Sequence, residues 1–208
     1  MPLHKIEWTR RQCGWAIWRI TETEQELSKL ASPETVPADI AAPLKRLEWL
    51  GGRLLLRQLV EQAGLSYQGL LKDEFGKPSL DRNAHHISLS HSFPYVAAQI
   101  DFDFVGIDLE QPKEKMIRIA HRVFNPEEER DAGKDLVKNC VYWCAKEALY
   151  KIHGSGGISF AKNLSIAPFT LAAGGIIKGK ISIGSSVREF DLAYSKESDY
   201  ILVRTVTA

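Results

Sequence analysis

The order of hydrophobic and polar positions alternates between strand-like and helix-like stretches. A mostly apolar and aromatic run over residues 14–20 predicts a buried strand. The polar stretch 22–43 contains three prolines, which predicts a loop with short helical turns. From Lys45, leucines at positions 47, 50, 54 and 55 repeat at helical spacing and predict a long helix that ends at Gly64.

The rest of the chain continues this alternation. Glycine-containing turns are expected around Gly69 and at 75–78, and Asn125 followed by proline and three glutamates is typical of a helix start. Further strands are predicted over 87–91, 95–100 and 104–110, and helices over 114–123, from 125 and over 141–153. The last fifty residues read as short strands joined by turns (164–166, 176–183, 187–194 and 200–206), which indicates an antiparallel sheet.

Composition excludes several classes of protein. The chain has 208 residues, of which 44% are hydrophobic and 25% charged, as in an ordinary globular protein. A formal net charge of only +1 gives no basic excess, so a nucleic-acid partner is not expected. No apolar run is long enough to cross a membrane, and the first residues do not resemble a signal peptide, so we expect a cytoplasmic protein. We also expect a monomer. Cys140 and Cys144, four residues apart, fit a buried helix face better than a redox role.

Asp108 and Glu110 are the first residues that suggest chemistry. Alternate residues of a strand leave it on the same face, with Cα atoms ~6–7 Å apart. Two carboxylates placed in this way repel each other unless a cation or water lies between them, and oxygen ligands of this kind suit Mg²⁺. The alternative is an exposed strand edge with two solvated acids.

Glu147 and Lys151 form a second pair, because residues four apart share one face of a helix. Such a pair is usually a surface salt bridge. Here the surrounding residues of 141–152 are largely apolar and aromatic, which indicates a buried helix whose charged residues, including Lys146, line a cleft.

A third group, Ser90-His91-Ser92, ends a predicted strand with two hydroxyls and an imidazole. These residue types suit a cluster of donors for phosphate oxygens. A serine hydrolase of the α/β type would need a nucleophile elbow, and the sequence has none; it also lacks a P-loop. We expect His85 and His86 to be ordinary surface or turn residues.

Taken in order, four segments resemble the motifs of the 4′-phosphopantetheinyl transferases, in particular the larger single-chain, surfactin-synthetase-activating type. The segments are Phe75-Gly76-Lys77-Pro78, Ser88-Leu89-Ser90-His91-Ser92, Val105-Gly106-Ile107-Asp108-Leu109-Glu110 and Trp143-Cys144-Ala145-Lys146-Glu147-Ala148-Leu149-Tyr150-Lys151. The resemblance covers residues 75–151, and the helix from Lys45 extends it toward the N-terminus.

The resemblance implies an α+β fold of two similar halves, 1–103 and 104–208, each a long helix on a small antiparallel sheet, with the active site between them. It also implies an activity, transfer of the phosphopantetheine arm of coenzyme A to a serine of an apo acyl or peptidyl carrier protein, with release of adenosine 3′,5′-bisphosphate.

The resemblance further implies roles for particular residues. Mg²⁺ would be held by Asp108, Glu110 and Glu147, while Lys151, Ser90 and His91 would donate to the pyrophosphate of coenzyme A, with Lys146 as a second cation. Basic residues would hold the 3′-phosphate; the candidates are Lys45, Arg46, Lys77 and, favoured, Arg53. The base that takes the serine proton would be Glu147 or, from its distance to the Gly-Ile-Asp-Leu-Glu motif, Glu128. Alternatively, the acids 127–129 only stabilise the N-terminus of their helix by complementing its dipole.

The segment 111–124 would dock the acidic carrier protein. Its apolar residues Met116, Ile117 and Phe124 lie beside Lys113, Lys115 and Arg118.

Two other functions fit parts of the pattern: a non-catalytic carrier- or nucleotide-binding module on the same fold, and a Mg²⁺-dependent phosphohydrolase. The acid triad argues against the first, and the Gly-Lys-Pro and Ser-His-Ser segments have no purpose in the second. The carrier, and whether it serves fatty-acid, polyketide or peptide synthesis, stays open.

Overall fold

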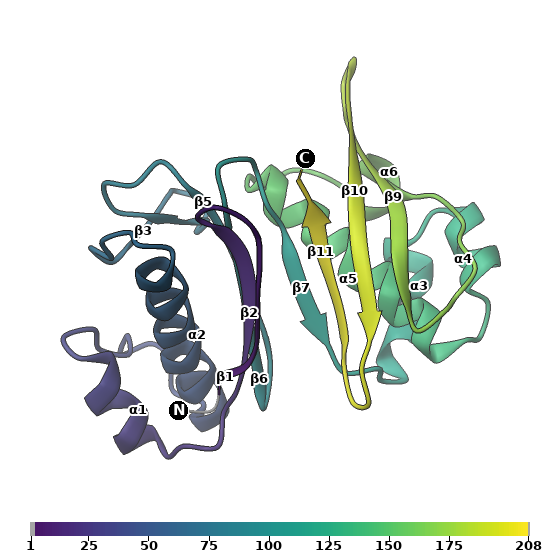
Figure 1. Ribbon diagram of the computed structural model, residues 1–208. Helices are drawn as coiled ribbons and strands as arrows, with labels where there is room; N and C mark the ends of the chain where they lie inside the picture. Colours follow the sequence, from purple (N-terminus) through teal and green to yellow (C-terminus); the bar gives the residue numbers. More distant parts are fainter. Residues whose placement is uncertain (1–2, 208) are drawn as a thin grey trace. The chain divides into compact units, whose positions relative to one another are not determined.

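The computed structural model describes residues 3–207, and its fold is α+β, as expected. The chain forms two compact units. The N-terminal unit consists of the residues up to Leu71 together with Pro78–Phe104, and the C-terminal unit of Lys72–Lys77 together with the residues from Val105 onward. Mixed helices and antiparallel sheets occur in both units (Figure 1).

The N-terminal unit is built on a four-stranded antiparallel sheet of order β1-β2-β6-β5. Its strands are β1 (Leu3–Arg10), β2 (Cys13–Arg19), β5 (His86–Ser92) and β6 (Tyr95–Asp101), and its helices are α1 (Glu24–Ala31) and α2 (Pro43–Gln62). A separate short ribbon pairs β3 (Leu70–Lys72) with β4 (Pro78–Leu80). Figure 1 shows α2 lying along one face of the sheet, with α1 beside it.

The leucine periodicity explains how α2 packs. Leu50, Leu54 and Leu55 are buried and join one core with Trp18 of β2 and Val96 of β6. The helix begins at Pro43, where the missing backbone donor costs nothing because first-turn N–H groups have no partner inside the helix. The predicted helix is thus confirmed, with its start two residues earlier.

The C-terminal unit is built on a five-stranded antiparallel sheet of order β7-β11-β10-β9-β8. The long helix α5 (Leu136–His153) packs against this sheet, and its apolar side chains Val141, Cys144 and Leu149 form the centre of the core. The strands are β7 (Ile107–Glu110), β8 (Leu164–Ile166), β9 (Gly174–Ile183), β10 (Ser186–Lys196) and β11 (Ile201–Val206), and the other helices are α3 (Lys115–Val123), α4 (Pro126–Ala132) and α6 (Phe160–Asn163).

Local capping sets the ends of the helices in this unit. The Asn125 side chain accepts from the backbone N–H groups of Glu127 and Glu128, so α4 begins where the sequence predicted. Helix α5 ends at Gly154, whose φ of +73° is the left-handed conformation that favours glycine. It begins five residues before the expected position 141, because the Asp135 side chain caps Lys138 N.

Two other expectations are wrong in detail, and one strand was missed. The stretch 22–43 contains a true helix, α1, whose Thr23 and Glu26 form a capping box. Strand β1 was not predicted, because its residues alternate too weakly to distinguish a strand. The strand expected over 104–110 begins only at Ile107.

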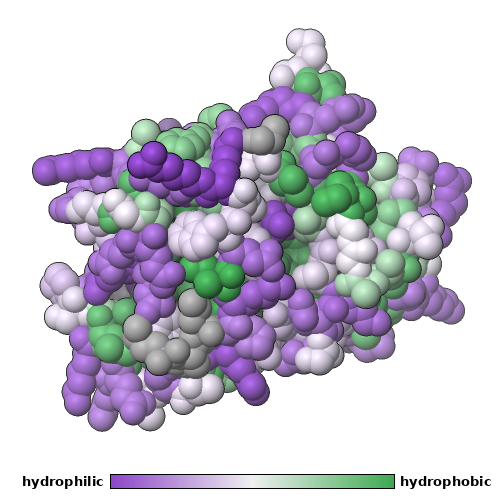
Figure 2. Space-filling view, viewed as in Figure 1, coloured by the Kyte–Doolittle hydropathy of each residue, from purple (hydrophilic) through white to green (hydrophobic). Residues whose placement is uncertain are grey.

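On the face drawn in Figure 2, hydrophilic residues predominate and hydrophobic ones form smaller separate areas. No helix among residues 3–207 combines the length and the hydropathy that a membrane crossing needs.

Gly106, directly before β7, makes the closest backbone approach between that segment and α5. A Cβ atom at this position would lie 2.0 Å from the carbonyl oxygen of Ala148. Thr205 of β11 fixes the same residue from the other side: its Oγ1 accepts from Gly106 N at 3.1 Å, and its N–H donates to Gly106 O at 2.9 Å. Only glycine fits between these two neighbours.

We therefore expect Gly106→Ala to destabilise the fold by about 3 kcal/mol or more, because a methyl group must displace the backbone of α5. Gly52→Ala is the matched control: a Cβ at position 52, inside α2, meets no atom within 4 Å. It should stabilise by about 0.5–1 kcal/mol through helix propensity. Urea unfolding of both variants measures the difference, and equal stability of the two would contradict the packing described here.

Candidate active site

Strand β7 places two carboxylates on one face of the C-terminal sheet. Asp108 and Glu110 lie opposite Val203 and Ile201 of β11, and their alternation along the strand directs both side chains to the same side. β7 pairs with β11 at the end of the sheet order. Asp108 is buried and Glu110 half-buried, so the pair is not the exposed, solvated edge that the sequence left as an alternative.

Helix α5 adds a third carboxylate and a cation from the facing layer. The Lys151 ammonium lies 2.7 Å from Oδ1 of Asp108 and donates to the carbonyl oxygen of Ile107 at 2.9 Å. Lys151 is thus bonded to β7 and not to Glu147, its neighbour four residues before. The alternative considered from the sequence, a surface salt bridge between Glu147 and Lys151, is therefore not formed.

The pKa of Glu147 reports the crowding of negative charge. This pKa is raised to about 7, mainly by burial and then by the carboxylates of Asp108 and Glu110, while Lys151 lowers it. Strand β7 and helix α5 carry the three predicted carboxylates, and Asp108 and Glu110 act electrostatically on Glu147. The tight approach at Gly106 permits this, since it allows β7 and α5 to lie close together.

Two buried thiols lie behind this group on α5. Cys140 and Cys144 are unpaired and buried, as the sequence predicted. Cys140 Sγ is 3.8 Å from the carbonyl oxygen of Glu110. Burial raises the pKa of the Cys144 thiol, as do Cys140 and the carboxylates of Asp108 and Glu110.

Lys77 reaches the same helix from the Phe-Gly-Lys-Pro segment. Its ammonium donates to the carbonyl oxygen of Ile152 at 2.8 Å, in the last turn of α5. A turn held by Asp73, whose Oδ1 accepts from Phe75 N and Lys77 N, directs the lysine there. Burial lowers the Lys77 pKa. Lys77 thus belongs to the same unit as Asp108, Glu147 and Lys151.

Glu128 and Lys146 lie elsewhere and form a buried ion pair of their own. Both side chains have no exposed surface, and the ammonium is 2.5 Å from Oε2 of Glu128. The same ammonium donates to the carbonyl oxygens of Val123 and Phe160, while the Glu128 carboxylate accepts from the backbone N–H of Ile166 and of one further residue, Asn125. Burial lowers the Lys146 pKa and Glu128 opposes this.

This pair corrects two expectations. A side chain without exposed surface cannot touch a carrier protein or coenzyme A, so Lys146 does not serve as a ligand residue in this conformation. For the same reason Glu128 does not serve as the general base. The pair instead connects the ends of α3, α4 and α6 and the strand β8 to α5. Sequence spacing missed this role because the partners are far apart along the chain.

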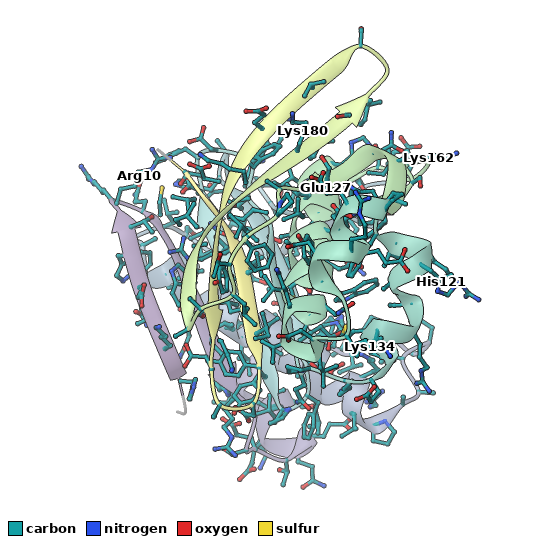
Figure 3. The ribbon with its side chains drawn as sticks, turned by 90° about the vertical axis from the view of Figure 1, so that its right-hand side faces the viewer. Arg10, His121, Glu127, Lys134, Lys162 and Lys180 are labelled. Atoms are coloured by element: carbon teal, nitrogen blue, oxygen red, sulfur yellow. The ribbon has the colours of Figure 1, made fainter. Side chains whose placement is uncertain are left out.

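The segment proposed for carrier docking also differs from the expectation. Met116 and Phe124 are buried in the core, so they are not part of a surface. What α3 exposes is basic, and Figure 3 shows its labelled His121 projecting outward from the helix. The exposed basic residues of α3 are Lys115, Arg118, His121 and Arg122.

The remaining candidates belong to the N-terminal unit. Ser90 is buried in β5, and His91 is exposed beside Glu48 of α2, with Nδ1 3.2 Å from Oε2. Arg53 lies over the ring of Trp49 and 3.6 Å from the Glu34 carboxylate. The structure thus places these three residues in one unit and the carboxylate group in the other.

The comparisons with known proteins agree with the earlier resemblance. Residues 104–202 match the family model of the 4′-phosphopantetheinyl transferase superfamily. The 4′-phosphopantetheinyl transferase gsp of Aneurinibacillus migulanus is 32% identical over 114 residues, which cover 51% of this chain and 48% of that protein. The transferases ffp and Sfp of Bacillus subtilis are each 35% identical over 89 residues, 40% of either chain. The chain therefore matches half or less of the length of these relatives.

The buried pair generates a stability prediction. Lys146→Met should cost about 3–5 kcal/mol, because it leaves the Glu128 charge buried without a partner. Glu128→Gln should destabilise the Lys146→Met variant much less than it destabilises the wild type. We expect a coupling free energy of about 1–3 kcal/mol between the two substitutions in a double-mutant cycle. Urea unfolding measures all four proteins, and Glu127→Gln on the exposed side of α4 is the control, with a change below ~0.5 kcal/mol. Strictly additive effects would show that the two side chains do not interact.

Proposed function

Because residues 104–202 match the family model of the 4′-phosphopantetheinyl transferase superfamily, we propose that this protein transfers the phosphopantetheine arm of coenzyme A to a serine of an apo carrier protein. The observation that carries the proposal is the group of Asp108, Glu110 and Glu147 beside Lys151, on the segments that the family model covers. Their chemistry suits a reaction at a pyrophosphate.

The reaction explains why these residue types are needed. The serine oxygen attacks the β-phosphorus, the bond from that phosphorus to the bridging oxygen breaks, and adenosine 3′,5′-bisphosphate leaves. The pyrophosphate is strongly negative and repels a nucleophile until its charge is neutralised. Lys151, held at Asp108, presents an ammonium to that charge. The partly exposed position of Lys151 leaves it accessible to a ligand.

We further propose that Asp108, Glu110 and Glu147 hold Mg²⁺. No group of three or more His, Cys, Asp or Glu side chains in the described part of the chain stands in a metal-holding arrangement. The donor set nevertheless suits a hard cation, because all three side chains are carboxylates and Asp108 and Glu110 add to the burial that raises the pKa of Glu147. When bound, the cation would neutralise charge on the pyrophosphate oxygens.

The proton of the attacking serine has to go to a nearby acceptor. Among the two glutamates considered from the sequence, Glu147 is only half-buried and Glu128 has no exposed surface. We therefore assign proton acceptance to Glu147 or to a water that it orients. Ser90 and His91 stay proposed donors to coenzyme A.

The exposed basic face of α3 supports an acidic partner. Lys115, Arg118 and Arg122 give it positive charge beside the C-terminal core, and we propose that it attracts the acidic carrier protein. We also propose that the two halves, 1–103 and 104–208, act together in the reaction.

Intact-mass spectrometry of an apo carrier incubated with coenzyme A tests the function. The carrier should gain one phosphopantetheine arm. Asp108→Asn and Glu147→Gln should each slow the transfer by about 10²–10³-fold, as expected for losing a major electrostatic stabiliser. Glu129→Gln, an exposed acid of α4, is the control and should leave the rate unchanged. Release of inorganic phosphate without carrier modification would instead indicate a phosphohydrolase.

Metal removal tests the cation. Transfer should stop in excess chelator and return with Mg²⁺, and Mg²⁺ alone should raise the melting temperature of the unmodified protein because binding stabilises the folded state. Asp108→Asn should lose most of that thermal shift. An undiminished transfer rate in excess chelator would exclude the metal.

A further inference from the structure

A serine and a histidine form a close pair at the end of α5. The Oγ atom of Ser155 lies 2.7 Å from Nε2 of His153, the last residue of the helix. When the imidazole carries its proton on Nδ1, the Ser155 hydroxyl donates to Nε2, which can then accept that proton. A serine hydroxyl hydrogen-bonded to a neutral imidazole is the arrangement by which proteins activate a serine as a nucleophile.

The turn that follows α5 keeps this pair accessible. Ser155 lies in the segment 154–157, where Gly154 and Gly157 adopt φ values of +73° and +86° that favour glycine. The side chains of Ser155 and His153 are half-buried, and Gly156 and Gly157 beside them are exposed. The helix end therefore fixes the histidine and the glycine turn presents the serine, while both stay within reach of a ligand.

Cations stand around the same turn. Lys151 precedes Gly154 by three residues, a distance of about 4.5 Å along the helix axis. The side chain of Lys77 lies against Gly154, because a Cβ atom there would be 2.2 Å from Lys77 Cδ and 2.8 Å from its Nζ. The pKa of Lys77 is lowered mainly by burial and also by Arg188 of β10, so these two cations lie near each other. Their positive charge favours an anionic ligand beside Ser155.

The proposed reaction supplies an electrophile of that charge. Its donor substrate carries a pyrophosphate, and the proposed partner of that pyrophosphate, Lys151, precedes Ser155 by four residues, about one helical turn. The carrier serine would have to reach the same phosphorus from another molecule, whereas Ser155 is already tethered beside it. Tethering of this kind raises the effective concentration of a reacting group.

We propose that Ser155 is an internal acceptor that takes the phosphopantetheine arm when no carrier protein is bound. The Ser155 oxygen bonds to the β-phosphorus of coenzyme A, the bond from that phosphorus to the bridging oxygen breaks, and adenosine 3′,5′-bisphosphate leaves. The proton of the hydroxyl passes to Nε2 of His153. The proposal rests on the proposed transferase function and adds a second acceptor to it, one that each chain can use once.

Intact-mass spectrometry of the protein alone tests this self-modification. After incubation with coenzyme A and Mg²⁺ but without carrier, the wild type should gain the mass of one phosphopantetheine arm, and peptide mapping should place it on Ser155. Ser155→Ala should reduce the modified fraction by about tenfold or more, because the nucleophile is gone. His153→Gln should slow the modification by about 10²-fold, the usual loss when a general base is removed.

Ser159→Ala is the matched control. It removes another hydroxyl four residues further along, at an exposed position before α6, and should leave self-modification unchanged. All three variants should still modify an apo carrier at the wild-type rate, which also shows that they are folded. A wild type that modifies the carrier but never itself would overturn the proposal. So would self-modification that persists in Ser155→Ala or proceeds at the full rate in His153→Gln.

A fluorophosphonate probe separates this inference from the proposed function. The probe needs neither coenzyme A nor carrier: an activated serine oxygen bonds to its phosphorus, fluoride leaves, and the base takes the proton. The probe should label Ser155 of the wild type, and His153→Gln should lose most of that label. If no carrier is ever modified, the transferase function fails, while the labelling still decides whether Ser155 is a nucleophile. A wild type that stays unlabelled at Ser155 would refute that role.

Discussion

The backbone contact between Gly106 and Ala148 is the constraint on which the carboxylate group depends. β7 can lie against α5 only because residue 106 has no Cβ, and Thr205 holds the same residue to β11 by two hydrogen bonds. With that spacing fixed, Asp108 on the strand comes within 2.7 Å of Lys151 on the helix. The side chains of Asp108 and Lys151, 43 residues apart in the sequence, thereby come into contact in a partly buried position, where charge interactions are stronger than in water.

Helix α5 carries charge on two of its sides, and each side has a different purpose. Lys151 contacts Asp108 and Ile107 of β7, and Glu147 lies within electrostatic reach of Asp108. Lys146, one residue before Glu147 and so rotated by about 100° around the axis, points into the packing of α3, α4 and α6 and meets Glu128 there. A buried pair of this kind is costly to desolvate. Here the pair holds separate elements together, since its two side chains make hydrogen bonds to four backbone groups from different elements.

The sequence allowed the fold class, the long helices and the C-terminal antiparallel sheet to be predicted, because leucine periodicity, caps and glycine turns are local signals. Strand alternation also placed Asp108 and Glu110 on one face, whereas their grouping with Glu147 was implied by the family resemblance and stays a prediction. The sequence could not reveal that Glu128 and Lys146 neutralise each other, or that Glu48 lies on His91. Those contacts join residues 18 to 43 positions apart, and only the packed structure decides them. The prediction that Met116 and Phe124 belong to a docking surface was wrong for a related reason. The basic residues between them face solvent, whereas Met116 and Phe124 face the core.

The burial of all three cysteines has a practical consequence for observing this protein at work. Cys13, Cys140 and Cys144 are buried, and the Cys144 thiol resists ionisation, so thiol-directed dyes have no reactive target in the folded chain. A single cysteine introduced at an exposed position of α3, such as Lys115, would then be the one labelled residue. A fluorophore there would report the arrival and departure of a partner on that basic face in real time.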